Sequence, residues 1–242
     1  MGLEIGIVNE LIDMLHLNPP INLYKICEYL NIKIKYKPLK EADGYFILKK
    51  GLKIIVLKDT YKNTIKERFT IAHELAHYLL PGHDCKVLSK FKNTDYIAKS
   101  KYNEKEKEAN AFAAQLLMPD VFIKEYLENI MPNKIEEIIK LSNLYNVSLT
   151  SLLCKYVDVS YESIALLYYK DNIVLWNYYD YDKFDYHINN CNLDKDLISN
   201  VYQEDFSKRY IKEDIDDKVY IYLFDINKNE KILLVYIKQR NF

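Results

Sequence analysis

Two histidines four positions apart, inside an apolar helical stretch, constrain this chain more than any other feature of its sequence. Residues 73–77 read His-Glu-Leu-Ala-His, the H-E-x-x-H motif. Because residues four apart share one face of a helix, His73 and His77 can both reach one metal ion. Glu74 lies beside them, where it can accept a proton from a water molecule on that ion. The pattern therefore predicts a zinc site of the peptidase type on a helix.

The sequence around this motif predicts where that helix begins and ends. The Thr64-Ile-Lys-Glu67 segment has capping-box spacing, which marks a helix start, and Pro81-Gly82 ends the pattern. Because the apolar residues between them recur at helical spacing, the helix is expected to be buried. Buried histidine and glutamate side chains need partners, which a metal would supply. The alternative is that the two histidines satisfy each other in a core without a metal.

A zinc site of this kind needs a third protein ligand, and the sequence offers two candidates. His83 lies six residues after His77, which is the metzincin spacing, but Leu80 stands where metzincins have glycine. Glu106 lies in a second predicted helix and aligns with its apolar face, so we favour Glu106. The alternative for Glu106 is a structural role, because Asn103-x-x-Glu106 also has capping-box spacing.

Two segments taken together resemble the ImmA/IrrE family of metallopeptidases. The first runs from residue 69 to residue 80 and contains the histidine motif. The second runs from residue 106 to residue 119 and reads E-x-x-A-N-x-F-A-A-x-L-L-M-P. Looser similarity on both sides extends the resemblance over about residues 1–157. Because little chain precedes residue 21, the sequence resembles members that lack their own N-terminal helix-turn-helix.

The resemblance implies a metal site and a substrate class. It implies zinc held by His73, His77 and Glu106, with Glu74 as the general base. It also implies that the substrate is a helix-turn-helix repressor, which is cleaved to relieve repression of transcription. The alternative hypothesis is a regulator that needs zinc for its shape and binds a partner without proteolysis. The two differ at Glu74, because only the peptidase needs that carboxylate.

Charge and composition fit a cytoplasmic enzyme. The net charge is −1, and Arg68, Arg209 and Arg240 are the arginines, so we expect no direct contact with nucleic acid. Two helices predicted over residues 137–155 mimic a helix-turn-helix, but they carry few basic residues and are expected to complete the peptidase domain. Because the sequence has neither a signal-peptide pattern nor a membrane-spanning apolar run, we expect no membrane partner and a cytoplasmic location.

The expected fold class is α+β, in two domains. Residues 1–157 are predicted to form a zincin-like, mostly helical peptidase domain with a small antiparallel sheet. Its first helix is expected over residues 3–16, and strands at 44–48 and 52–57 are expected to form a hairpin. Either strand of this hairpin is a candidate to receive an extended substrate chain at a sheet edge.

Residues 158–242 are predicted to form a small α+β domain with a regulatory or substrate-binding role. A tyrosine-rich stretch around Asp171-Asn172 suggests one hairpin. The segments 219–224 and 232–237 suggest another, and a helix is expected over residues 193–201. Most of the tyrosines are expected to belong to the core of this domain or its rim.

Overall fold

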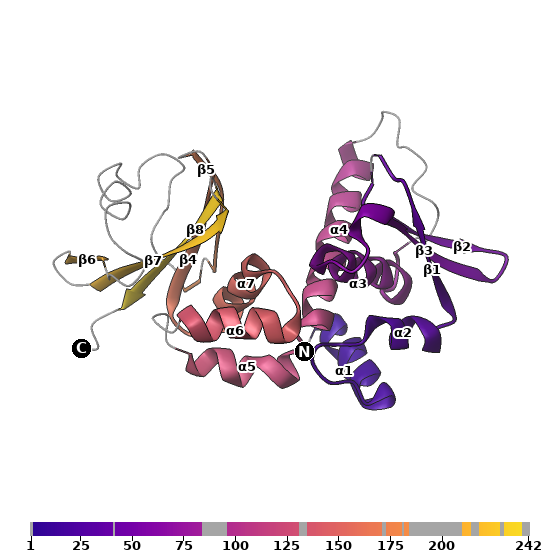
Figure 1. Ribbon diagram of the computed structural model, residues 1–242, viewed down its shortest axis with the longest axis horizontal. Coiled ribbons are helices and arrows are strands. Elements are labelled where there is room, and N and C mark those ends of the chain that lie inside the picture. Colours follow the sequence, from indigo (N-terminus) through magenta and orange to yellow (C-terminus); the bar gives the residue numbers. More distant parts are fainter. Residues whose placement is uncertain are drawn as a thin grey trace. The chain divides into compact units, whose positions relative to one another are not determined.

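The computed structural model in Figure 1 describes residues 2–40, 42–83, 96–130, 135–170, 173–180, 182–183, 210–213, 218–227 and 230–238. Its helices and sheets confirm the α+β class. Contacts divide the chain into two compact units, Met1–Glu125 with Leu141–Ser148 and Tyr126–Lys140 with Leu149–Phe242. The domain boundary predicted at residue 157 stays a prediction. In the described part of the chain, every helix is too short or too polar to cross a bilayer.

The first unit consists of a small sheet flanked by helices. In chain order its main elements are α1 (Leu3–Leu15), α2 (Leu23–Tyr29), β1 (Ile32–Lys37), β2 (Gly44–Lys49), β3 (Leu52–Lys58), α3 (Ile65–Leu79) and α4 (Tyr96–Leu117). The predicted first helix and the predicted hairpin are present, with bounds that differ by one residue at some ends. The hairpin turns at Lys50 and Gly51, and both residues have positive φ. A two-residue turn needs positive φ to match the twist of the two strands.

The sheet of this unit is mixed, with strand order β1-β3-β2. The expected antiparallel pairing is present between β2 and β3, whereas β1 pairs with β3 in parallel, which the sequence analysis had not predicted. The reason is that β3 is the most apolar strand, and its Ile55, Val56 and Leu57 are almost fully buried. It therefore takes the central position, where neighbours cover both of its sides, and β2 lies at one edge of the sheet as far as the described residues show.

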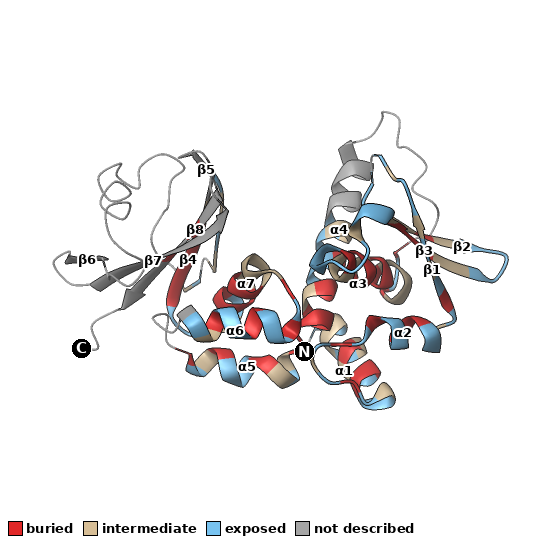
Figure 2. Ribbon diagram, in the orientation of Figure 1, coloured by how far each residue is buried: buried red, intermediate tan, exposed pale blue. Residues whose placement is uncertain are grey.

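Helix α3 packs on β2 and β3, and α4 packs on α3. Figure 2 shows buried residues along α3 and along the second half of α4. Alanines at 72 and 76 on α3, and at 109 and 113 on α4, are fully buried. Because these side chains are small, the two helix backbones can approach closely. Helix α4 begins at Tyr96, so Asn103 lies inside the helix and the capping-box alternative for Glu106 was wrong.

The remaining elements include three helices and a five-stranded sheet. They are α5 (Asp120–Asn129), α6 (Ile135–Tyr145), α7 (Leu149–Val159), β4 (Ser163–Lys170), β5 (Ile173–Tyr179), β6 (Tyr210–Glu213), β7 (Lys218–Asn227) and β8 (Glu230–Lys238). The sheet is antiparallel, in the order β5-β4-β8-β7-β6, and α7 packs against β4 and β5. Both predicted hairpins are present, whereas the helix expected over residues 193–201 lies outside the described residues.

Candidate metal centre

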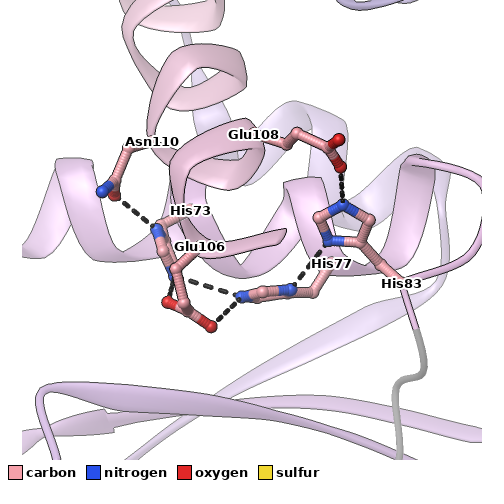
Figure 3. A network of polar contacts seen from close by, with 6 residues as sticks. All are labelled: His73, His77, His83, Glu106, Glu108 and Asn110. Carbon is pink, nitrogen blue, oxygen red and sulfur yellow. Dashed lines mark hydrogen bonds and ion pairs between the residues drawn. The ribbon is translucent and has the colours of Figure 1, made fainter. Parts of the chain in front are cut away.

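Helix α3 brings both histidines of the motif to one face. Thr64 caps its N-terminus, and the Thr64 hydroxyl oxygen accepts a hydrogen bond from the Glu67 amide at 3.1 Å. The helix then runs without interruption through the motif to Leu79. The Nε2 atoms of His73 and His77 lie 3.1 Å apart, and both side chains are mostly buried (Figure 3). One turn of α3 therefore supplies two nitrogen donors that point to a common place.

Helix α4 adds Glu106 to this pair. Its Oε2 lies 3.1 Å from His73 Nε2, and its Oε1 lies 3.4 Å from His77 Nε2. One donor atom from each of the three residues falls within 4.8 Å of the other two. The structure thus brings together the three residues that the sequence analysis named as metal ligands. It does not bring His83 to the same point.

The three donors fit a divalent metal such as zinc. Tetrahedral bonds of about 2.0–2.1 Å place neighbouring donor atoms about 3.3 Å apart, close to the three distances found here. Two imidazole nitrogens and a carboxylate that converge in this way repel one another unless a cation or a proton lies between them. The hydrogen bonds from His73 and His77 hold the pKa of Glu106 well below its ordinary value. The centre therefore favours a negative carboxylate, as a cation site requires.

The electrostatics of His73 fit the same arrangement. Burial alone would lower the pKa of His73, but the hydrogen bond to Glu106 and the negative charges of Glu74 and Glu106 outweigh burial and raise it. In the absence of a metal, this imidazole therefore holds a proton more strongly than an ordinary histidine does. A metal ion and a proton compete for the same nitrogen, since a histidine ligand must be unprotonated at the atom that binds.

The outer nitrogens of the two imidazoles also have partners. His73 Nδ1 lies 2.9 Å from the Asn110 side-chain oxygen, one helical turn after Glu106. His77 Nδ1 lies 3.0 Å from Nδ1 of His83. From the sequence, His83 had been considered only as a ligand. A backbone reversal at Gly82, where φ is +74°, returns the chain towards α3, and no spacing rule would have revealed this contact.

Glu74 lies in the same centre but on the side of strand β2. Its side chain is buried, and burial raises the pKa of Glu74 to about 7, although both imidazoles favour its charged form. The backbone amide of Phe46 on β2 donates a hydrogen bond to this carboxylate. A carboxylate that titrates near neutral pH can both accept and return a proton, which is the property of a general acid–base group.

Tyr78 follows the second histidine but is engaged elsewhere. Its ring stacks on Phe46 at 5.2 Å between centroids, and Lys53 Nζ lies 4.8 Å from its centroid. The sequence analysis had assigned no catalytic role to Tyr78, and these contacts give it a place between α3 and the hairpin. The side chains of α3 thus divide between the metal centre and the packing that holds β2 beside it.

Known proteins match this chain in sequence and in fold. Residues 27–155 match a peptidase family model described as the IrrE N-terminal-like domain. Metallopeptidase ImmA of Bacillus subtilis (strain 168) is 30% identical over 135 residues, which is 55% of this chain and 75% of that protein. Uncharacterized immunity region protein 2 of Bacillus phage phi105 is 32% identical over 106 residues, 43% of this chain and 63% of that protein. A solved Mycobacterium tuberculosis transcriptional regulator shares the fold, with a TM-score of 0.62 over 99% of this chain and 77% of its own, at 11% identity.

Proposed function

Since the chain belongs to the ImmA/IrrE family of metallopeptidases, we propose that it is a zinc-dependent endopeptidase that cleaves a helix-turn-helix repressor. The family assignment confirms the resemblance seen in the sequence. One observation carries the proposal: two imidazole nitrogens and the Glu106 carboxylate converge beside a buried Glu74. This donor set, with its H-E-x-x-H motif and a glutamate from a second helix, is of the gluzincin type.

In this proposal each residue has a defined role. His73, His77 and Glu106 would hold the zinc ion, which when bound would supply Lewis-acid chemistry towards the scissile carbonyl and a water. The Glu74 carboxylate accepts the proton of the attacking water and then donates it to the nitrogen of the leaving amine. A positioned general base of this kind contributes about 10²–10⁴-fold to the rate. Burial of the Glu74 side chain raises its pKa above the ordinary value, which favours the uptake of this proton before it is passed on.

We propose that the substrate chain binds along β2. Of the two hairpin strands that were candidates, β3 is paired on both sides, whereas β2 is an edge strand among the described residues. The Phe46 amide on β2 reaches Glu74, so this edge borders the metal centre. An extended peptide can add to such an edge by main-chain hydrogen bonds, which hold a scissile bond in place without strict sequence selection. The bound segment of the repressor must therefore be extended.

The choice of a repressor as substrate rests on the family resemblance. A related phage protein is named for an immunity region, which fits an anti-repressor role in a mobile element. We propose that the enzyme acts in the cytoplasm, where such repressors bind DNA. Direct DNA binding by the chain itself is not favoured, because Lys155, one of the few basic residues at 137–155, is buried. Residues 1–157 are proposed as the catalytic domain, and residues 158–242 as a regulatory or substrate-binding domain.

The test is incubation of the purified protein with any helix-turn-helix repressor that a neighbouring gene encodes. Cleavage should require zinc, stop with a chelator, and fall by at least about 10²-fold in Glu74→Gln. Glu104→Gln is a matched control, because it makes the same change at an exposed position of α4. Unchanged cleavage by Glu74→Gln would refute the mechanism. If Glu74→Gln relieved repression in cells as fully as the wild type while His73→Ala did not, the partner-binding alternative would replace it.

A further inference from the structure

A chain of polar contacts continues outward from His77. Its Nδ1 lies 3.0 Å from His83 Nδ1, and the Nε2 of His83 lies 2.8 Å from Glu108 Oε2 (Figure 3). The side chain of His83 is 1% exposed, whereas that of Glu108 is 63% exposed. The contacts therefore lead from the candidate metal centre, through a buried imidazole, to a carboxylate at the surface of α4.

The segment that carries His83 is attached to α4 at two points. Glu108 contacts the imidazole, and Lys105 donates a hydrogen bond to the carbonyl of Gly82. The amide of His83 also donates to the Leu80 carbonyl at 3.4 Å, across the turn at Gly82. The position of the imidazole behind His77 is thus fixed by contacts from both helices rather than by the His77 contact alone.

The chemistry of neutral imidazole gives these contacts one direction. A histidine that binds a metal through Nε2 carries its proton on Nδ1, so His77 must donate and His83 Nδ1 must accept. A neutral His83 then carries its proton on Nε2, where it donates to the Glu108 carboxylate. In this arrangement each of the two hydrogen bonds, His77 to His83 and His83 to Glu108, joins one donor to one acceptor.

We propose that His83 and Glu108 are a positioning pair that fixes the tautomer and ring orientation of His77 as a metal ligand. The inference rests on the proposed function, because it takes His77 to be a ligand. Partners of this kind make a histidine ligand more basic and fix its orientation. His73 has a different partner, the neutral side-chain amide of Asn110, so the two histidine ligands are supported unequally. Residue spacing alone associates His83, six residues after His77, with the role of third metal ligand. In this proposal His83 acts through His77 instead.

The first test measures zinc affinity of the full chain by competition with a fluorescent chelator. His83→Phe keeps a ring but has no nitrogen, and it should weaken zinc binding about 10–100-fold. Glu108→Ala should weaken binding about three- to tenfold, because solvent replaces part of an exposed partner. Glu108→Gln still offers an acceptor oxygen and should restore most of the affinity. Glu104→Ala, the same change at an exposed position one turn earlier on α4, should bind zinc as the wild type does.

Coupling between the two residues gives a sharper result than either variant alone. In the His83→Phe background, Glu108→Ala should have no further effect, because its partner is gone. Wild-type affinity in both His83→Phe and Glu108→Ala would overturn the proposal. Far-UV circular dichroism of the zinc-free variants checks their folding, and Glu108→Ala changes an exposed side chain, so its result stands even if His83→Phe fails to fold.

The second test observes the protons directly. Nitrogen-15 NMR of the zinc-loaded protein, labelled at histidine, should find His83 neutral, with its proton on Nε2 and an unprotonated Nδ1. A proton on Nδ1 of His83 would overturn the positioning pair, whatever the zinc affinities of the variants. Glu106→Ala separates this proposal from the proposed function. If Glu106→Ala binds zinc as tightly as the wild type, the metal centre itself is wrong. If Glu106→Ala loses zinc binding while the His83 and Glu108 variants keep wild-type affinity, only the positioning pair is refuted.

Discussion

Replacing Gly44 with alanine should destabilise the protein by a predictable amount, because β2 lies too close to α3 for a methyl group. A Cβ atom at residue 44 would lie 2.6 Å from the Thr70 methyl carbon, 3.1 Å from the Val56 carbonyl oxygen and 3.2 Å from a Leu57 methyl carbon. The Thr70 methyl cannot rotate away freely, since Thr70 is buried and its hydroxyl donates to the Lys66 carbonyl at 2.8 Å. One of the two elements must therefore move.

The expected magnitude combines two opposing terms. Overpacking of a core contact costs about 1–3 kcal/mol, and alanine recovers about 0.4–1 kcal/mol by restricting the unfolded chain. The free energy of unfolding should therefore fall by about 1–2 kcal/mol in Gly44→Ala. Gly6→Ala is the matched control: no atom lies within 4 Å of a Cβ there, and the residue is exposed in α1, so this variant should gain about 0.5–1 kcal/mol.

A double-mutant cycle tests the cause of the loss. Thr70→Ser removes the obstructing methyl but keeps the hydroxyl and its hydrogen bond. The loss in Gly44→Ala should shrink by at least about 1 kcal/mol in the Thr70→Ser background, because residues in contact are not additive. Urea unfolding followed by far-UV circular dichroism provides the four free energies. Additive losses, or a Gly44→Ala variant as stable as the wild type, would refute the close approach of β2 to α3.

Three further predictions concern other parts of the first unit. Glu67→Ala should lower the free energy of unfolding by about 2–4 kcal/mol, as urea unfolding can measure. The reason is that the buried carboxylate accepts hydrogen bonds from the Tyr24 and Tyr36 hydroxyls and from the Asn63 amide. Glu67→Gln keeps an acceptor and should lose less than half as much. Burial raises the pKa of Cys27 from 9.0 to about 12. Iodoacetamide at pH 8 should therefore label this thiol only after unfolding, as peptide mass spectrometry can measure. Rapid labelling of the native protein would contradict the burial of Cys27. Free zinc at 1,000 times Kd should raise the free energy of unfolding by about 4 kcal/mol in the wild type and by far less in His77→Ala. An equal increase in both proteins would show that zinc binds elsewhere.

Local sequence patterns were enough to predict α3 and the shared helix face of His73 and His77. The cap at Thr64, the apolar spacing and the stop at Pro81 act within a few residues of one another, so short-range rules apply. Glu106 was predictable for a related reason, because its alignment with the alanine-rich face of α4 indicated which neighbour it meets. The capping box at Asn103 was misleading because α4 begins at Tyr96, seven residues before Asn103.

Features that depend on contacts between distant segments were not predictable from the sequence. The insertion of β3 between β1 and β2 is decided by which strand buries most apolar surface, and alternation within a strand does not reveal its neighbours. The contact between His83 and Glu108 joins residues 25 positions apart through a turn at Gly82. Strand β6 has four residues and pairs with β7, and so short a strand has too little alternation for a sequence pattern to detect.

X-ray diffraction from crystals grown with zinc tests the central claim most directly. An anomalous difference map at the zinc absorption edge should contain one strong peak in the first unit, bonded to Nε2 of His73, Nε2 of His77 and a carboxylate oxygen of Glu106. His83 should contact His77 and not the ion. No peak between these three side chains, or a peak bound by other residues, would contradict the account.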